Sequence, residues 1–307
     1  MVRSLLATAL ATGALICSPP STEPASAIAR GTNAPDGAYR FSVRLAMTGL
    51  PTADHGTRDS WCSGALVAPR WVITAGHCFR DADGRRVSRP VAARTTATIG
   101  RTDLTSRNGH QAEVVSVHQS ATADVALAEL GTAVTDITPL AIGTEPPAVG
   151  AVLRLTGYGL TDDSETATTR RLQTGQFTVD RVDDSSIAVS GRAPSTWTSP
   201  CLHDSGGPYF QQRAGRPVLV AVVSMGPGCP HPGADFSART DNLADWIAAT
   251  IEGRSTGRLS RGATRLALGA GVLVLLAALF VAVRTVRRRP AGPRSPRPRR
   301  PAAAGHR

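Results

Sequence analysis

Short apolar runs, separated by polar turns, dominate the pattern of hydrophobic positions between residues 28 and 251. Clusters of Gly, Pro and Asp lie between the runs, and several runs alternate apolar with polar residues. This pattern is typical of the strands of an all-β barrel or sandwich. The clearest runs are SGALVAP (63–69), WVITA (71–75), VALAEL (125–130), VLRLTGYG (152–159), QFTVDRV (176–182) and VLVAVVSMG (218–226).

The pattern changes twice towards the end of the chain. TDNLADWIAATI (240–251) has a capping residue followed by apolar positions at helical spacing, which predicts one C-terminal helix. LALGAGVLVLLAALFVAV (266–283) then runs for 18 residues without a charge. A helix of that length spans roughly 27 Å, close to the thickness of a bilayer's hydrocarbon core. The second segment therefore predicts a single transmembrane helix.

The first 27 residues predict a secretory signal peptide. Arg3 precedes the apolar stretch LLATALATGALI (5–16), and ASA (25–27) fits a small-residue cleavage site. The RTVRRRP sequence after the span indicates that residues 284–307 form a basic, disordered cytoplasmic tail. Residues 252–265 then form a stalk. We expect residues 28–251 to be an extracellular domain on a single-pass protein of the cell membrane, and cleavage of the stalk would shed this domain.

The positive charge of the chain belongs to its C-terminal part. The whole sequence carries a formal charge of +11 and contains no lysine, but residues 28–251 alone carry −1. Nine arginines without an acid lie in 284–307, and four lie in 252–265 with one Glu. A nearly neutral body argues against nucleic acid as a partner.

Cysteine usage fits an exported domain. Cys17 lies in the predicted signal peptide, and its removal leaves Cys62, Cys78, Cys201 and Cys229. An even number of cysteines in an exported domain suggests two disulfides, although spacing alone allows three pairings.

Candidate catalytic residues come from three separated motifs. His203, Asp204 and Ser205 are adjacent, but neighbouring side chains diverge and cannot line up as nucleophile, base and acid. The base and the acid must therefore come from elsewhere. WVITAGHCF (71–79) supplies His77, and ADVALAEL (123–130) supplies Asp124.

With HDSGGP (203–208) these motifs follow the order His, Asp, Ser, and the region 28–251 resembles the trypsin/chymotrypsin family of serine proteases, in a bacterial, secreted and membrane-anchored form. The resemblance implies two six-stranded antiparallel β-barrels with a C-terminal helix and a site in the cleft between the barrels. It also implies the catalytic roles: Ser205 as the nucleophile, His77 as general base and then general acid, and Asp124 as the residue that orients His77.

The same resemblance assigns supporting roles. Ser224 matches the serine that supports Asp124, and the backbone N–H groups of His203 and Ser205 match the donors of the oxyanion hole. The implied disulfides are Cys62–Cys78 and Cys201–Cys229.

Asp204 has a separate expected role. In the family, the acid before the nucleophile forms an ion pair with a free N-terminal amine. IARGTNA (28–34) resembles the family's mature start, and Ile28 directly follows ASA. We expect signal peptidase to expose Ile28, whose amine then pairs with Asp204. The alternative is cleavage at another bond, which would leave Ile28 an ordinary strand residue.

The resemblance also outlines a specificity pocket. Ser199 lies at its base, Gly226 and Gly233 form its walls, and Met225 lies beside it. No acidic residue lies at the base of this pocket, and its two wall residues are small. The resemblance therefore implies a preference for substrates with large apolar or aromatic side chains.

The leading prediction is a monomeric serine endopeptidase acting on protein or peptide substrates without cofactor or metal. Its main alternative is an inactive or weakly active relative that binds a protein partner, because His203 stands where the family usually has Gly. A single-pass receptor would leave the three motifs unexplained. The remaining histidines fall in polar segments and are expected to be solvated: His55, His110, His118, His231 and His306.

Overall fold

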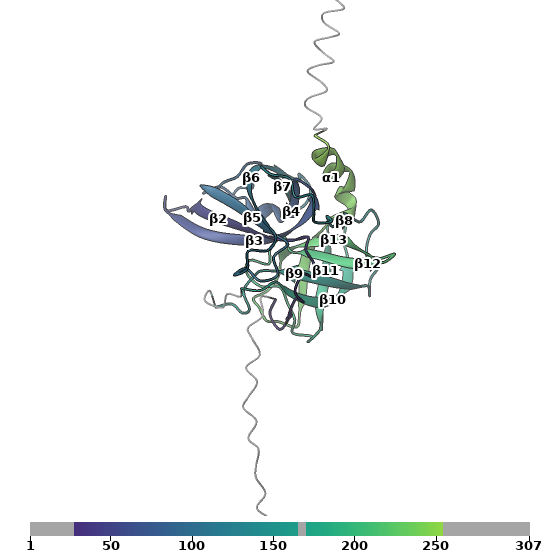
Figure 1. Cartoon of the computed structure of the whole chain (residues 1–307). Helices are drawn as coiled ribbons and strands as arrows, with labels where there is room; N and C mark the ends of the chain where they lie inside the picture. The colour runs from purple at the N-terminus through teal and green to yellow at the C-terminus, as the bar shows by residue number, and fades with distance from the viewer. Residues whose placement is uncertain (1–27, 165–169, 254–307) are drawn as a thin grey trace, which may run out of the picture. The chain divides into compact units, whose positions relative to one another are not determined.

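A computed structural model describes residues 28–164 and 170–253 (Figure 1). The predicted signal peptide, span and tail lie outside these residues, as does nearly all of the predicted stalk. Within the described part, no helix is long and apolar enough to cross a membrane. Residues 1–251 and 252–307 separate into two units, and the fold below is that of the first.

The first six-stranded barrel is closed in the order β2-β3-β4-β7-β6-β5, and all its pairings are antiparallel. Alternate residues of its strands point inward, as the buried Val43, Leu45 and Met47 of β2 illustrate. Its strands are β2 (Ser42–Pro51), β3 (Thr57–Ala68), β4 (Trp71–Thr74), β5 (Arg94–Ile99), β6 (His110–Gln119) and β7 (Ala126–Leu130).

The second barrel also closes with six antiparallel strands, in the order β9-β10-β11-β14-β13-β12 and back to β9. Two short strands extend it: β1 (Thr32–Asn33) pairs with β10, and β8 (Ala141–Ile142) runs parallel to β13. The barrel strands are β9 (Val152–Gly157), β10 (Gln173–Val182), β11 (Ser186–Ala193), β12 (Pro208–Arg213), β13 (Arg216–Met225) and β14 (Ala234–Arg239).

Three main apolar clusters hold this unit together. One fills the first barrel and another the second. The third joins them, because it combines Ile73 and Leu127 of the first barrel with Phe210 and Leu219 of the second. Since apolar burial is the main favourable contribution to folding, the joining cluster holds the two barrels side by side.

The C-terminal helix is shorter than predicted. Residues Asp241–Leu243 form a 3₁₀ turn, η2, and the α-helix α1 covers Ala244–Ile251. The side chain of Thr240 makes no capping hydrogen bond. The first turn therefore tightens instead of starting as an α-helix.

Both implied disulfides are present, Cys62–Cys78 and Cys201–Cys229. The two six-stranded barrels, the C-terminal helix and the cysteine pairing are thus confirmed.

Candidate active site

Each barrel contributes half of the polar cluster formed by the three motifs. His77 lies in the 3₁₀ turn η1 (Gly76–Cys78), which follows the buried strand β4. Asp124 precedes β7, and Ser205 precedes β12 of the second barrel. Ser224 lies near the end of β13. Three of these residues lie in turns at strand ends, where a rigid barrel holds side chains that remain accessible.

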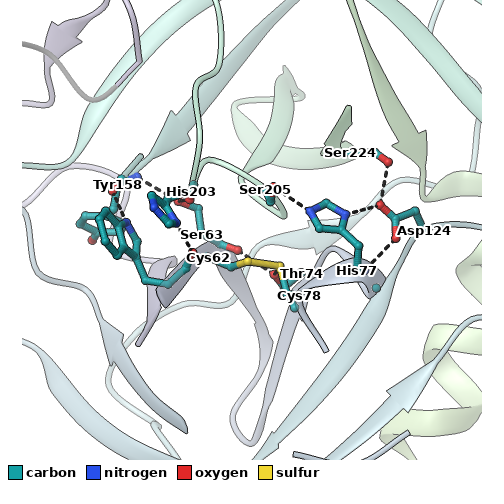
Figure 2. The surroundings of a disulfide bond; sticks show 12 residues. Cys62, Ser63, Thr74, His77, Cys78, Asp124, Tyr158, His203, Ser205 and Ser224 are labelled. Atoms are coloured by element: carbon teal, nitrogen blue, oxygen red, sulfur yellow. Dashed lines mark hydrogen bonds and ion pairs between the residues drawn. A yellow bond between two sulfur atoms is a disulfide. The ribbon is translucent and has the colours of Figure 1, made fainter. Parts of the chain in front are cut away.

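Hydrogen bonds join the four side chains in one line (Figure 2). The Oγ of Ser205 is 2.8 Å from Nε2 of His77, and Nδ1 of His77 is 2.7 Å from Oδ2 of Asp124. The backbone N–H of His77 donates to Oδ1 of Asp124 over 2.8 Å. The hydroxyl of Ser224 donates to Oδ2 of Asp124 over 2.7 Å.

The carboxyl of Asp124 is ionised at neutral pH. Burial acts to raise its pKa, but the hydrogen bond and charge of His77, the Ser224 hydroxyl and the His77 N–H together outweigh burial and lower the pKa to about 2. Nη1 of Arg86 lies 3.6 Å from Oδ1 of the same carboxylate.

This arrangement can carry out nucleophilic chemistry. An ionised carboxylate only accepts hydrogen bonds, so Nδ1 of His77 must carry the proton. Nε2 of His77 is then a free acceptor and can take the proton of Ser205 as its Oγ attacks an electrophile.

Gly206 allows the Ser205 loop to reach the first barrel. Its φ is +80°, and a Cβ there would lie 2.1 Å from Oγ1 of Thr74 and 2.5 Å from the carbonyl oxygen of Ser63. The N–H of Ser63 also donates to the carbonyl of Ser205 over 2.9 Å. The loop that carries Ser205 therefore packs directly on β3 and β4.

His203 lies apart from the line of four side chains. Its Nδ1 is 2.8 Å from the carbonyl oxygen of Trp61, and Figure 2 shows its ring directed away from the Ser205–His77 pair. His203 has a positive φ of +74°, which favours glycine.

Asp204 is fully buried and makes its hydrogen bonds away from the Ser205–His77 pair, to two backbone groups of the second barrel. It accepts hydrogen bonds from the N–H groups of Gly159 (2.9 Å) and Cys201 (3.0 Å). Burial raises its pKa to about 8, against the effect of these two bonds. Ile28 is buried in the core of the second barrel. In this chain the nitrogen of Ile28 belongs to a peptide bond, so the predicted ion pair with Asp204 stays a prediction.

The predicted pocket residues have further neighbours. Ser199 is buried, and its N–H donates to the carbonyl of Ala29 over 3.2 Å. Its Oγ accepts from the N–H of His231 over 3.4 Å, and the N–H of Gly233 donates to Nδ1 of His231 over 3.1 Å. His231 is therefore buried, which corrects the expectation of a solvated side chain; these backbone contacts hold it inside.

Asp235 was not expected at this site. It is 2% exposed, and its Oδ1 lies 2.0 Å from where a Cβ on Gly226 would be. Nε2 of His231 is 3.3 Å from that oxygen. Burial and the charge of Asp204 raise the pKa of Asp235 to about 8. Alternation along ADFSAR could have revealed it, because Asp235 and Ser237 occupy the buried face of β14.

Two hollows meet at His77. One, of about 840 Å³, is lined by Asp124, Ser224 and Met225, among other residues. The other, of about 740 Å³, is lined by Trp61, His203 and Ser205, among others. An extended chain could thus lie on both sides of Ser205. Among residues 28–164 and 170–253, no group of three or more His, Cys, Asp or Glu side chains is arranged to hold a metal ion.

Known proteins match this part of the chain. A family model described as "Trypsin" matches residues 28–247. "Serine protease 56" of Mus musculus is 30% identical over 250 residues, which is 72% of this chain and 38% of the mouse protein. "Serine protease 56" of Homo sapiens is 29% identical over 259 residues, with coverages of 75% and 39%. The chain spans about two fifths of the length of these relatives. Both are mammalian and give no support to a bacterial source.

Proposed function

The chain belongs to the trypsin family of serine proteases, and from this premise we propose that it is a serine endopeptidase. The observation that carries the proposal is the unbroken hydrogen-bonded line from Ser224 through Asp124 and His77 to Ser205. In the proposed reaction, Ser205 Oγ attacks the scissile carbonyl while Nε2 of His77 takes its proton. His77 then gives that proton to the leaving amine, and water hydrolyses the acyl-enzyme by the same route. Asp124 stays ionised throughout.

The proposed oxyanion hole consists of the N–H groups of His203 and Ser205. These donors would stabilise the negative oxygen of the tetrahedral intermediate, and the loss of one such donor typically lowers kcat by about 10²–10³.

The alternative function is that of an inactive relative that binds a protein partner. The positive φ of His203 favours it, because a residue with a Cβ is strained in that conformation. If the peptide before His203 flipped to relieve this strain, the N–H of His203 would no longer serve as an oxyanion donor.

Labelling by a serine-directed phosphonate separates these functions. We expect the exported full-length protein to be labelled, and the Ser205→Ala and His77→Ala variants to remain unlabelled. Folded wild-type protein that takes up no label would establish the inactive relative instead.

We also propose that the enzyme is tethered to the outer face of a membrane by residues 266–283. The uncharged stretch of 18 residues and the arginines after it support this. A chain ending at residue 265 should then appear in the medium, while the full chain fractionates with membranes. Equal release of both chains would contradict the tether.

The amine of Ile28 is proposed to pair with Asp204 after signal removal. The burial of both residues supports this, because a buried carboxylate requires a partner charge. N-terminal sequencing of the exported protein should read Ile-Ala-Arg-Gly, and another start would refute the proposal.

The proposed preference at the specificity pocket is for a large apolar or aromatic side chain. Ser199 brings no charge to the base, and Asp235 is protonated at neutral pH with a pKa of about 8. Cleavage of matched peptides carrying Phe, Leu or Arg before the scissile bond tests this preference; fastest cleavage after Arg at pH 7 would overturn it.

A further inference from the structure

The Leu202–His203 peptide is held in an orientation that His203 does not itself favour. With φ at +74°, His203 lies in the left-handed region, which a side chain disfavours. A flip of this peptide by about 180° would bring φ to a negative value that any residue adopts. The flip would also turn the N–H of His203 the opposite way. Contacts elsewhere must therefore oppose it.

Trp61 supplies two of these contacts to the His203 ring. The rings of Trp61 and His203 stack with centroids 3.6 Å apart and an interplanar angle of 18°. Nδ1 of His203 lies 2.8 Å from the carbonyl oxygen of Trp61. Because that carbonyl can only accept, Nδ1 carries the proton, which fixes the ring in one orientation.

A second route runs from Trp61 to the other side of the same peptide. The indole N–H of Trp61 donates to the carbonyl of Tyr158 over 2.7 Å. Two residues further along, the N–H of Leu160 donates to the carbonyl of Leu202 over 2.8 Å. That bond holds the carbonyl of the Leu202–His203 peptide, whose N–H points the opposite way because the peptide is trans and planar.

Ser63 connects the two routes (Figure 2). Its hydroxyl donates to the carbonyl of His203 over 3.1 Å and accepts from the N–H of Tyr158 over 2.9 Å. The guanidinium of Arg44 lies 4.9 Å from the centroid of the Trp61 ring and supports the indole by a cation–π contact.

We propose that Trp61 is a positioning residue for the oxyanion hole. By stacking on His203 and anchoring the 158–160 segment, Trp61 holds the Leu202–His203 peptide with its N–H towards the cleft. The contacts of the side chain at position 203 thereby stabilise the positive φ that glycine would adopt without strain. This inference rests on the proposed endopeptidase function.

The test is a double-mutant cycle on the exported full-length enzyme with a peptide substrate. We expect Trp61→Ala to lower kcat by about 10–100-fold, since it weakens one oxyanion donor without removing it. KM is expected to change as well, because Trp61 also lines the hollow beside Ser205; the comparison of backgrounds isolates the effect that acts through His203. In a His203→Gly background, the same Trp61→Ala change should cost less than about threefold, because glycine adopts positive φ unaided.

Substitutions of His203 provide an independent comparison. The kcat of His203→Ala should lie about 10–100-fold below that of His203→Gly, a loss similar to that caused by Trp61→Ala. Alanine retains the strain of positive φ but has no ring to hold. Trp61→Phe should restore most of the activity, because it keeps an aromatic face against His203.

A peptide aldehyde separates positioning from general damage. Its tetrahedral adduct on Ser205 places an oxygen in the oxyanion hole, so its affinity should fall in parallel with kcat across the variants.

Three outcomes would overturn the inference. One is an equal loss from Trp61→Ala in both backgrounds, a second is an unchanged kcat in Trp61→Ala, and a third is equal activity of His203→Ala and His203→Gly. If Trp61→Ala fails to fold, the two His203 variants and Trp61→Phe still decide. Wild-type enzyme without Ser205-dependent labelling would refute the proposed function itself, and the inference with it.

Discussion

Gly206 shows how one absent side chain permits the contact between the two barrels. A Cβ at this position would meet Oγ1 of Thr74 and the backbone nitrogen of Ala75 at 2.1 and 2.5 Å, and the residue also has φ of +80°. Both a clash and a backbone strain therefore oppose any other residue immediately after Ser205.

We predict that Gly206→Ala abolishes activity. It should also lower the free energy of unfolding by more than the strain of a positive φ alone, because the added Cβ clashes with its neighbours. Gly215 is a matched control, because it has φ of +77° and nothing lies within 4 Å of its missing Cβ. Gly215→Ala should cost only about 1–2 kcal/mol, the strain of the left-handed conformation. Urea unfolding of both variants measures the difference; equal losses would mean that the contact with Thr74 is unimportant.

Asp235 gives the proposed specificity pocket a titratable wall. Its carboxyl lies against Gly226 and faces His231 and Asp204. Burial lowers the pKa of His231, so that ring is neutral at and above pH 7 and does not compensate a negative charge.

We therefore predict a selectivity that changes with pH. Below pH 8 the Asp235 carboxyl is protonated and neutral, and above pH 8 it becomes negative. The ratio of kcat/KM for Arg peptides over Phe peptides should thus rise between pH 7 and pH 9.5. A pH effect that acts through His77 or Ser205 changes kcat/KM for both peptides by the same factor, so it cancels in this ratio. Asp235→Asn should make the ratio independent of pH, and a ratio that still rises in that variant would assign the change to another group.

At the scale of the elements, the Cys62–Cys78 disulfide ties β3 to the turn that carries His77. Cys201–Cys229 ties the segment before Ser205 to the segment after β13. The first bridge thus fixes the His77 turn to a strand, and the second joins two loops of the second barrel.

Removal of Cys62–Cys78 should lower the free energy of unfolding by about 3 kcal/mol, the loop-closure contribution of a bridge of this span. It should also lower kcat, because His77 precedes Cys78. Chemical denaturation and peptide hydrolysis of Cys62→Ala/Cys78→Ala measure both effects. The Cys201→Ala/Cys229→Ala variant serves for comparison: its loop is longer, so a smaller loss of stability there would contradict the loop-closure explanation.

Strands and motifs could be predicted from the sequence to different extents. Apolar runs such as that of β13 indicated an all-β barrel or sandwich. The family resemblance carried by the TAGHC, ADVALAEL and DSGGP motifs implied two barrels and the three proposed catalytic residues. Alternation along β14 indicates that Asp235 is buried, but its place at the candidate site depends on pairing with β11, which lies farther back in the sequence. The burial of His231 depends on contacts such as that with Ser199, which no local pattern encodes. The stack of Trp61 on His203 joins residues 142 positions apart, and no local pattern encodes it.

At the scale of the whole molecule, the start of the domain is packed into the second barrel, which shares an apolar cluster with the first. Ile28 fills the core of the second barrel, and Asp204 is buried beside the N–H of Gly159. In a chain that continues before Ile28, no amine neutralises the Asp204 carboxyl.

The uncleaved chain should therefore lose stability as pH rises. The folded state holds the Asp204 proton with a pKa of about 8, whereas an unfolded Asp releases it near pH 4. Stability is full below about pH 4 and falls towards pH 8, because the unfolded state binds fewer protons in this window. A chain starting at Ile28 should show a smaller fall. Thermal midpoints of both forms from pH 4 to 8 test this, and parallel curves would exclude the ion pair.

The position of Trp61 against His203 also gives the protein an intrinsic optical reporter. The chain has four tryptophans, and the centroid of the Trp61 indole lies 3.6 Å from that of the His203 imidazole, two residues before Ser205. Its emission therefore depends on whether the loop that carries His203 is ordered. Loss of order in that loop can therefore be followed by fluorescence in real time, without any substrate.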